Sequence, residues 1–169
     1  DTPSRKIGDI FEDLLYGDTP MGWDIAGDKE NIKKITQEDF LSYMKSLYSA
    51  TNMTVVIAGK FDEKTILERV NSYFGVLTKF PTVGFEKVVE KQNGPQVFVK
   101  FKKTEQSHFA LGVRTVGVED KKENYVLGVL ASVLGGGMSS RLFHEVREAR
   151  GLAYYVRASS DNYKGVGYL

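Results

Sequence analysis

The chain has 169 residues, of which 41% are hydrophobic and 27% charged, so it is long and apolar enough to form a folded core. Its 23 Lys and Arg residues nearly balance 22 Asp and Glu residues, which argues against a strongly electropositive nucleic-acid-binding protein. The absence of cysteine excludes disulfides, thiolate nucleophiles and cysteine-ligated metals. No apolar run approaches the roughly 20 residues of a membrane span, so we expect no membrane insertion.

Residues before position 76 predict three amphipathic helices and one strand. Each helix begins at an N-cap signal, and its apolar residues recur at helical spacing. The run 53–58 is continuous and mostly apolar, which is typical of a strand covered on both faces. The helices are expected to begin after Thr2, Thr36 and Asp62, and the buried face of the second should hold Phe40, Tyr43, Met44, Leu47 and Tyr48.

Residues 76–95 hold prolines, glycines and scattered charges without a sustained period, which indicates a boundary between two parts of the chain. Beyond it, alternation predicts strands at 96–102 and 109–113. A helix is expected from 120–123 to the triple glycine at 135–137, and another from Ser139 or Ser140 to Gly151. Further strands are expected at 153–158 and 165–169. Neither half is complete by this pattern, which favours two truncated domains and a chain that is part of a longer protein.

Several motifs carry no chemistry of their own. The run 135–140, Gly-Gly-Gly-Met-Ser-Ser, lacks the lysine of a phosphate loop and is better interpreted as a tight turn between helices. His108 and His144 lie 36 positions apart, on a predicted strand and a predicted helix, without metal-ligand spacing. No Gly-x-Ser-x-Gly elbow is present, so serine-based acyl transfer has no anchor.

Arg147 and Tyr154 flank the turn at Gly151, at a predicted junction of helix and strand. A guanidinium and a phenol that enter one cleft could donate hydrogen bonds to a peptide carbonyl and to the oxyanion that it becomes. The alternative is a solvated arginine and an ordinary strand tyrosine. We expect both side chains to be at least partly accessible, with the Tyr154 ring packed and its hydroxyl in water.

Residues 135–156, Gly-Gly-Gly-Met-Ser-Ser-Arg-Leu-Phe-His-Glu-Val-Arg-Glu-Ala-Arg-Gly-Leu-Ala-Tyr-Tyr-Val, resemble a signature of the insulinase family. This family includes pitrilysin and the mitochondrial processing peptidases, zinc peptidases with an inverted H-x-x-E-H motif. Residues 16–20 and 52–59 agree with it, so the resemblance covers essentially the whole chain. It implies an α+β, two-layer fold with a mixed, largely antiparallel sheet packed against helices. Residues 1–90 would be the C-terminal half of one domain, and 91–169 the N-terminal half of a second, homologous domain.

The resemblance also implies a zinc metalloendopeptidase that hydrolyses peptide bonds. In the family, the zinc motif and its glutamate ligand precede the part matched here, and this chain contains neither. We therefore expect zinc only in the full-length protein, with no metal bound by this chain and no activity of the chain alone. Arg147 and Tyr154 match a family arginine and tyrosine that reach from the second domain toward the substrate. They are the predicted catalytic residues.

Two other functions stay open. Some family members lack the zinc motif and act as non-catalytic partner or core subunits in binding and assembly, and an unrelated α/β binding module is a third interpretation. The expected partners are a peptide or unfolded polypeptide substrate and, within the family, a homo- or heterodimer, with no nucleic acid and no membrane. The expected location is the bacterial cytoplasm, with the mitochondrial matrix as the alternative.

Overall fold

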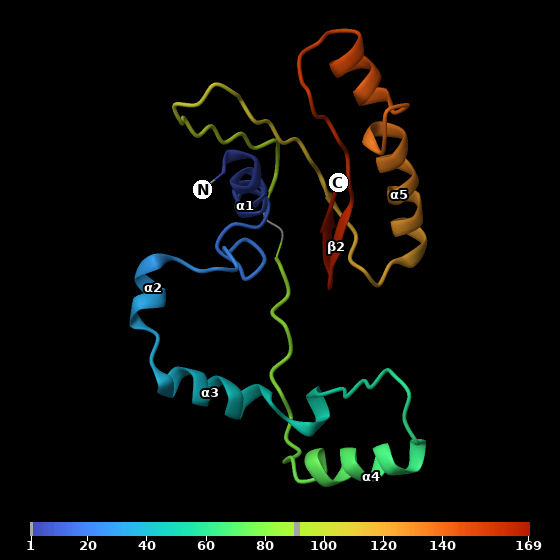
Figure 1. Cartoon of the computed structure of the whole chain (residues 1–169). Coiled ribbons are helices and arrows are strands. Elements are labelled where there is room, and N and C mark those ends of the chain that lie inside the picture. The colour runs from blue at the N-terminus through green and yellow to red at the C-terminus, as the bar shows by residue number, and fades with distance from the viewer. Residues whose placement is uncertain (1, 90–91) are drawn as a thin grey trace. The chain divides into compact units, whose positions relative to one another are not determined.

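The computed structural model describes residues 2–89 and 92–169, and the chain divides into two compact units. The sheet unit combines Asp1–Ile25 with Lys87–Leu169, and the helical unit spans Ala26–Glu86. The elements of the sheet unit are α1 (Pro3–Tyr16), β1 (Arg114–Thr115), α5 (Lys121–Gly135), the π-helical segment η2 (Phe143–Glu148), β2 (Asp161–Tyr163) and β3 (Val166–Tyr168) (Figure 1).

The three strands form an antiparallel sheet in the order β1–β3–β2. Tyr163 of β2 pairs with Val166 of β3, and Tyr168 of β3 pairs with Arg114 of β1. Because alternate residues of a strand face opposite sides, Tyr163, Val166 and Tyr168 share one face of the sheet, whereas Asn162 lies on the other.

Helix α1 packs on the face that holds the tyrosines. The core of the sheet unit consists of Leu15, Tyr16 and Val166, with Phe11 and Tyr168 packed against them. The Phe11 and Tyr168 rings meet edge to face with centroids 5.3 Å apart, a favourable aromatic geometry. The Tyr16 hydroxyl donates a hydrogen bond of 3.0 Å to the carbonyl of Gly167. These contacts join the first helix of the chain to its last strand.

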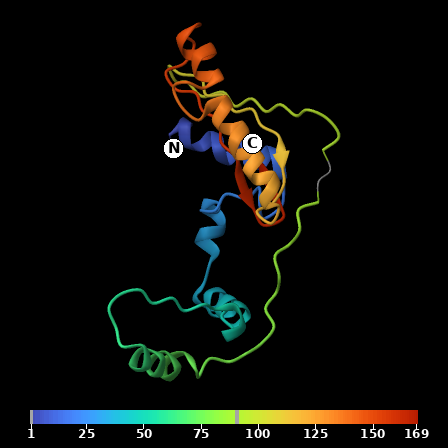
Figure 2. The ribbon, with the colours of Figure 1, turned by 90° about the vertical axis from the view of Figure 1, so that its right-hand side faces the viewer.

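Helix α5 runs along the opposite face of the sheet from α1, as the two perpendicular views show (Figures 1 and 2). Near its start, Asn124 accepts a hydrogen bond of 2.5 Å from Asn162 of β2. At its end, the Gly135 carbonyl accepts a bond of 3.3 Å from the backbone N–H of Ala158. The helix ends at the triple glycine as the sequence predicts.

The helical unit contains α2 (Lys29–Lys34), α3 (Gln37–Leu47), the 3₁₀ turn η1 (Ala50–Asn52) and α4 (Glu63–Phe74). Helix α3 begins with the predicted capping box, in which Thr36 and Asp39 exchange hydrogen bonds. Helix α4 begins with the predicted Asp62 cap, which accepts a hydrogen bond from the Thr65 N–H. Helix α2 was not expected, although Asp28 caps it in the same way.

Ser49 fixes the chain after α4 to the end of α3, and its side chain is fully buried. Its Oγ donates to the Phe80 carbonyl at 2.7 Å and accepts from the Phe80 N–H at 2.9 Å. The Ala50 N–H donates to the Thr78 carbonyl at 3.1 Å. A buried hydroxyl that both donates and accepts a hydrogen bond holds these two segments together within the helical unit.

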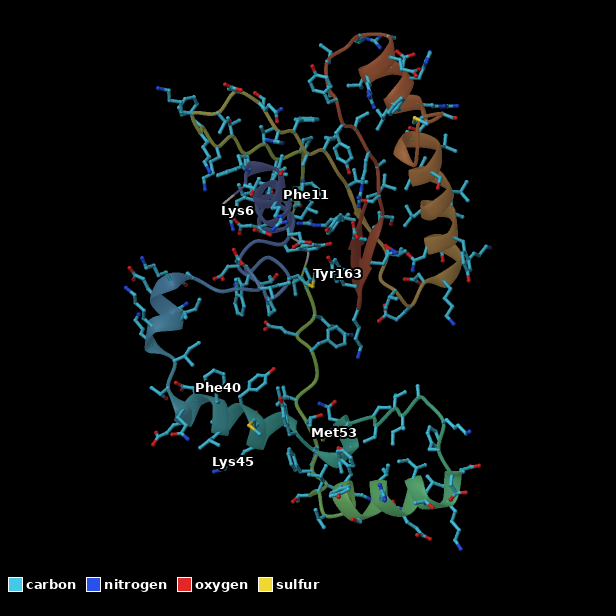
Figure 3. The ribbon with its side chains drawn as sticks, in the orientation of Figure 1. Lys6, Phe11, Phe40, Lys45, Met53 and Tyr163 are labelled. Atoms are coloured by element: carbon cyan, nitrogen blue, oxygen red, sulfur yellow. The ribbon has the colours of Figure 1, made fainter. Side chains whose placement is uncertain are left out.

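The apolar face predicted for α3 is exposed, which corrects the expectation that it is buried. Phe40, labelled on α3 in Figure 3, is 63% exposed. Tyr43 is 61% exposed. No sheet forms among the residues of the helical unit, all of which the structure describes, so this unit offers no broad apolar layer to cover the helix. The start of α3 is thus held by its capping box, while most of its apolar side chains remain exposed.

Three predicted strands are wrong: the described residues at 53–58, 96–102 and 153–158 are in no strand. The side chains of Val97, Val99 and Phe101 are 84–90% exposed. A strand requires a neighbour with which to exchange hydrogen bonds, and alternation along the sequence does not supply one. The strand predicted at 165–169 is confirmed as β3, and that predicted at 109–113 is displaced to Arg114–Thr115. Among the described residues, no helix is both long and apolar enough to cross a membrane.

Candidate functional site

Arg147 lies in η2, where the helical backbone widens. The N–H of Ala149 donates to the carbonyl of His144 at 2.8 Å, a bond that spans five residues instead of four. Helix-forming residues precede the widening from Arg141, close to the predicted start at Ser140. Such π-helical turns occur frequently at functional sites, because they alter the direction in which side chains project. Arg147 is exposed to solvent there.

The carboxylates beside Arg147 in the sequence are occupied by other partners. Glu145 pairs with Arg150, whose guanidinium also donates to the Glu145 carbonyl at 2.8 Å. The Arg150 hydrogen bond holds the pKa of Glu145 below its usual value. Glu148 Oε2 lies 2.9 Å from His144 Nδ1. Both acidic neighbours are therefore engaged, and Arg147 keeps a guanidinium that neither of them neutralises.

Tyr154 follows the turn that closes the helical segment. Gly151 adopts a φ of 60°, the left-handed conformation that favours glycine, and its N–H donates to the Arg147 carbonyl at 3.1 Å. The Leu152 N–H donates to the Val146 carbonyl at 3.0 Å. The chain then leaves the turn with Tyr154 89% exposed. Arg147 and Tyr154 thus flank one hydrogen-bonded turn.

The accessibility predicted for both residues is confirmed, but the Tyr154 ring does not pack as expected. The expected packing depended on a strand at 153–158, and among the described residues this segment is held by the Ala158–Gly135 bond and not by a neighbouring strand. Within the described chain, no hydrogen bond joins the Arg147 and Tyr154 side chains. The Arg147 guanidinium and the Tyr154 hydroxyl therefore both face solvent and do not bind each other. Both can donate hydrogen bonds to the carbonyl oxygen of an incoming ligand.

The residues that the structure describes do not form a zinc site. No group of three or more His, Asp or Glu side chains in the described ranges could hold a metal ion. His144 is engaged with Glu148, and His108 is exposed elsewhere in the chain. Because catalytic zinc requires three protein ligands, the chain as described does not fit this metal.

A carboxylate cluster between α1 and the sheet was missed by the sequence reasoning. Glu12 accepts hydrogen bonds from the hydroxyls of Tyr168 at 2.7 Å and Tyr163 at 3.1 Å. Burial raises the pKa of both tyrosines, so they stay protonated donors. Glu12 is more than 150 positions from either tyrosine along the sequence, so no local pattern could have indicated that they meet. The three side chains bind one another and anchor α1 to the sheet, so we assign them a structural role.

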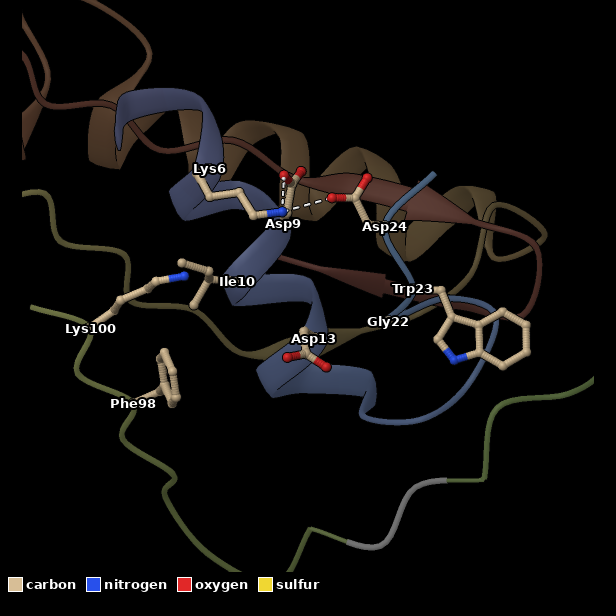
Figure 4. Close-up of a pocket in the computed structure, with 9 residues that line it drawn as sticks. All are labelled: Lys6, Asp9, Ile10, Asp13, Gly22, Trp23, Asp24, Phe98 and Lys100. Carbon is tan, nitrogen blue, oxygen red and sulfur yellow. Dashed lines mark hydrogen bonds and ion pairs between the residues drawn. The ribbon is translucent and has the colours of Figure 1, made fainter. Parts of the chain in front are cut away.

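A shallow cavity of about 350 Å³ lies beside α1 (Figure 4). Lys6 Nζ contacts Asp24 at 2.7 Å and Asp9 at 3.0 Å, and its pKa is raised chiefly by the Asp24 hydrogen bond. The Lys6 ammonium group is thus paired with two carboxylates. Phe98 supplies an apolar wall. The cavity contains no nucleophile or acid–base pair aimed at a common point, so we assign it no chemistry.

Comparison with known proteins identifies the family of this chain. Residues 34–169 match the family described as "Peptidase M16 inactive domain". An uncharacterized zinc protease of Mycobacterium leprae is 35% identical over the whole chain, which covers 38% of that protein. An uncharacterized zinc protease of Bacillus subtilis is 32% identical over the whole chain, which covers 40% of it. The chain therefore spans about two-fifths of the length of these curated relatives.

Solved structures share the fold. A peptidase M16 inactive domain from Pseudomonas fluorescens superposes with a TM-score of 0.72 and 21% identity, over 99% of this chain and 40% of that one. A protease from Helicobacter pylori gives a TM-score of 0.69 with 19% identity, over 94% of this chain and 39% of that one. The predicted α+β class is confirmed by these similarities. On the family match and the identity to its relatives, the chain belongs to the M16 peptidases, the zinc-protease family whose signature its residues 135–156 resemble.

Proposed function

We propose that this chain supplies the substrate-binding donors of a zinc-dependent peptidase. Arg147 and Tyr154 would bind the carbonyl of a peptide and stabilise the oxyanion that forms on it. The single observation that carries the proposal is the state of Arg147, which is exposed while both neighbouring carboxylates are engaged. A guanidinium whose N–H groups are not engaged by these carboxylates can use them as donors to a substrate.

Tyr154 would be the second donor. Its hydroxyl is exposed and can reach an external oxygen without first breaking a bond inside the protein. Preorganised donors stabilise charge that develops in the transition state, and removing one costs a factor of about 10²–10³ in kcat in well-studied hydrolases. The metal named in the relatives has no site among the described residues, so every step assigned here belongs to Arg147 and Tyr154.

The test of this role uses Tyr154→Phe in the full-length protein, with Tyr155→Phe as the matched control. Both tyrosines are exposed, at 89% and 73%, so neither loses a buried contact. We expect Tyr154→Phe to lower kcat/KM on an internally quenched peptide by at least tenfold while the melting temperature is unchanged. Tyr155→Phe should retain full activity. Equal activity of the two variants would remove Tyr154 from the site.

A non-catalytic role is the second candidate, and the description of the matching family as an inactive domain favours it. A partner subunit would present Arg147 and Tyr154 to a substrate held by another chain, or would serve only in assembly. The H-x-x-E-H motif in the full-length sequence separates the two candidates, because a self-sufficient peptidase needs it. Purified full-length protein that lacks the motif and hydrolyses no peptide alone would favour the partner role.

The partners and location follow from the same proposal. A peptide or unfolded polypeptide is the substrate class, and a homo- or heterodimer is the assembly. The bacterial cytoplasm is the proposed compartment, supported by the bacterial origin of the similar zinc proteases and by the absence of cysteine, which suits a reducing environment.

A further inference from the structure

Phe143 lies beneath the guanidinium of Arg147. The Cζ atom of Arg147 is 4.9 Å from the centroid of the Phe143 ring, within the roughly 6 Å range of a cation–π contact. The two residues are four positions apart, a spacing that brings side chains together on a helical surface. Phe143 is half-buried and Arg147 is exposed, so the ring is the more fixed partner.

The type of contact determines whether the Arg147 N–H groups remain available to bind a substrate. A carboxylate would neutralise its charge and occupy its N–H donors, as Glu145 does to Arg150. The face of an aromatic ring attracts the cation through its quadrupole and leaves the N–H groups at the guanidinium edge unoccupied. Phe143 therefore limits the positions of the Arg147 head without consuming its hydrogen-bonding capacity.

We propose that Phe143 is a positioning residue that acts through Arg147. It holds the guanidinium by its ring face so that the N–H donors stay directed toward the peptide carbonyl. This inference rests on the proposed function, because it assumes that Arg147 binds substrate. A guanidinium that is already held in position loses less side-chain conformational freedom when the substrate binds. The substrate therefore binds more tightly.

The experiment compares Phe143→Leu and Phe143→Tyr in the full-length protein, each alone and combined with Arg147→Ala. Tyrosine keeps an aromatic face and leucine removes it. An exposed cation–π contact corresponds to a factor of about two to five in an equilibrium. We therefore expect Phe143→Leu to lower kcat/KM about two- to fivefold on an internally quenched peptide, and Phe143→Tyr to retain activity. Tyr125→Leu removes an exposed ring from α5 and should change nothing.

The double variants distinguish positioning from a structural role. If Phe143 acts through Arg147, Phe143→Leu has no further effect once Arg147 is alanine. If leucine disturbs folding, Phe143→Met supplies a second non-aromatic side chain that adapts to the same space. An equal loss in both backgrounds, or the same loss with tyrosine as with leucine, overturns the positioning role. If Arg147→Ala alone leaves kcat/KM unchanged, the proposed function has failed, and this inference fails with it.

Discussion

Arg147 and Arg150 lie three positions apart, yet their guanidinium groups contact different partners. Arg150 is paired with Glu145, whereas Arg147 rests on an aromatic ring. Residue type and helical spacing alone do not distinguish these two arginines, and only the resemblance of residues 135–156 to a family signature selects Arg147. Their contacts distinguish them, because Arg150 binds Glu145 within the protein whereas Arg147 presents its N–H donors to solvent.

The hydrogen bonds to Glu12 lead to a prediction about the stability of the protein. Tyr168→Phe removes the shorter of the two hydroxyl bonds to the Glu12 carboxylate, at a half-buried position. Glu12 keeps the Tyr163 bond, so we expect the free energy of unfolding to fall by about 1–2 kcal/mol. Tyr125→Phe, at an exposed position of α5, should change it by less than about 0.5 kcal/mol. Urea denaturation measures both variants, and equal values would show that the Glu12 bond contributes nothing.

Helix α5 contains two glycines, Gly128 and Gly135, whose replacement by alanine should have opposite effects on stability. A Cβ on Gly135 would meet the Ala158 backbone N and lie 2.7 Å from the Arg157 carbonyl carbon, whereas one on Gly128 would meet nothing within 4 Å. Gly135→Ala should therefore destabilise the protein by about 1–3 kcal/mol through overpacking. Gly128→Ala should stabilise it by up to about 1 kcal/mol, since alanine favours a helix interior. Melting temperatures that move in the same direction would contradict this packing of α5.

The starts of α3 and α4 give a prediction about pH. Backbone N–H groups of Thr36 and Thr65 hold the pKa values of Asp39 and Asp62 below their usual value of about 3.9. Because the folded-state pKa is lowered, the stabilisation is present above the unfolded-state pKa and is lost as the pH falls through the folded-state pKa. We expect helical circular dichroism to stay constant from pH 7 to about 4 and to decrease below it.

The control for this effect is the double variant Asp39→Asn and Asp62→Asn. At the Asp62 N-cap, asparagine caps a helix about as well as aspartate. At position 39, inside the capping box, an asparagine amide oxygen can still accept the Thr36 N–H. Asparagine does not titrate in this range. The variant should keep its helical signal at neutral pH and lose less of it below pH 4 than the original chain. Identical acid profiles would mean that other carboxylates cause the loss.

The helices were predictable from the sequence and most of the strands were not. A helix satisfies its own backbone, and signals such as the Thr36–Asp39 capping box and the Asp62 cap are local and sufficient. A strand depends on a partner chosen by the rest of the fold, so the alternation at 96–102 predicts an element that the structure does not form. Helix α2 was missed because its six residues carry no apolar periodicity, although Asp28 was an available cap signal.

For the molecule as a whole, the division of the chain differs from what the composition indicates. The sequence places a boundary at 76–95, yet α1 packs with residues that follow this boundary. The apolar face of α1 predicts that the helix packs, and nothing local specifies that Val166 and Tyr168 complete its core. The assignment of 1–90 and 91–169 to successive homologous domains concerns ancestry, which packing does not test, and it stays a prediction.

The candidate site was predictable in part. The resemblance of residues 135–156 to a family signature selected Arg147 and Tyr154, and the structure confirms that both are accessible. The π-helical turn, the engagement of Glu145 and Glu148, and the Phe143 contact depend on backbone geometry that no spacing rule supplies. These features support a substrate-binding role for Arg147, which is the central claim.

The most direct test of that claim is kcat/KM for Arg147→Ala in the full-length protein, measured beside Arg150→Ala on the same internally quenched peptide. Both variants remove a guanidinium from one short segment, but only Arg150 has its guanidinium paired with Glu145. We predict that Arg147→Ala lowers kcat/KM by at least about 10²-fold with an unchanged melting temperature. Arg150→Ala should stay within about threefold of the unmodified protein, because it loses only exposed contacts with Glu145, an ion pair and a hydrogen bond to the backbone carbonyl. Equal losses for the two variants, or a loss that follows the melting temperature, would contradict a substrate-binding role for Arg147.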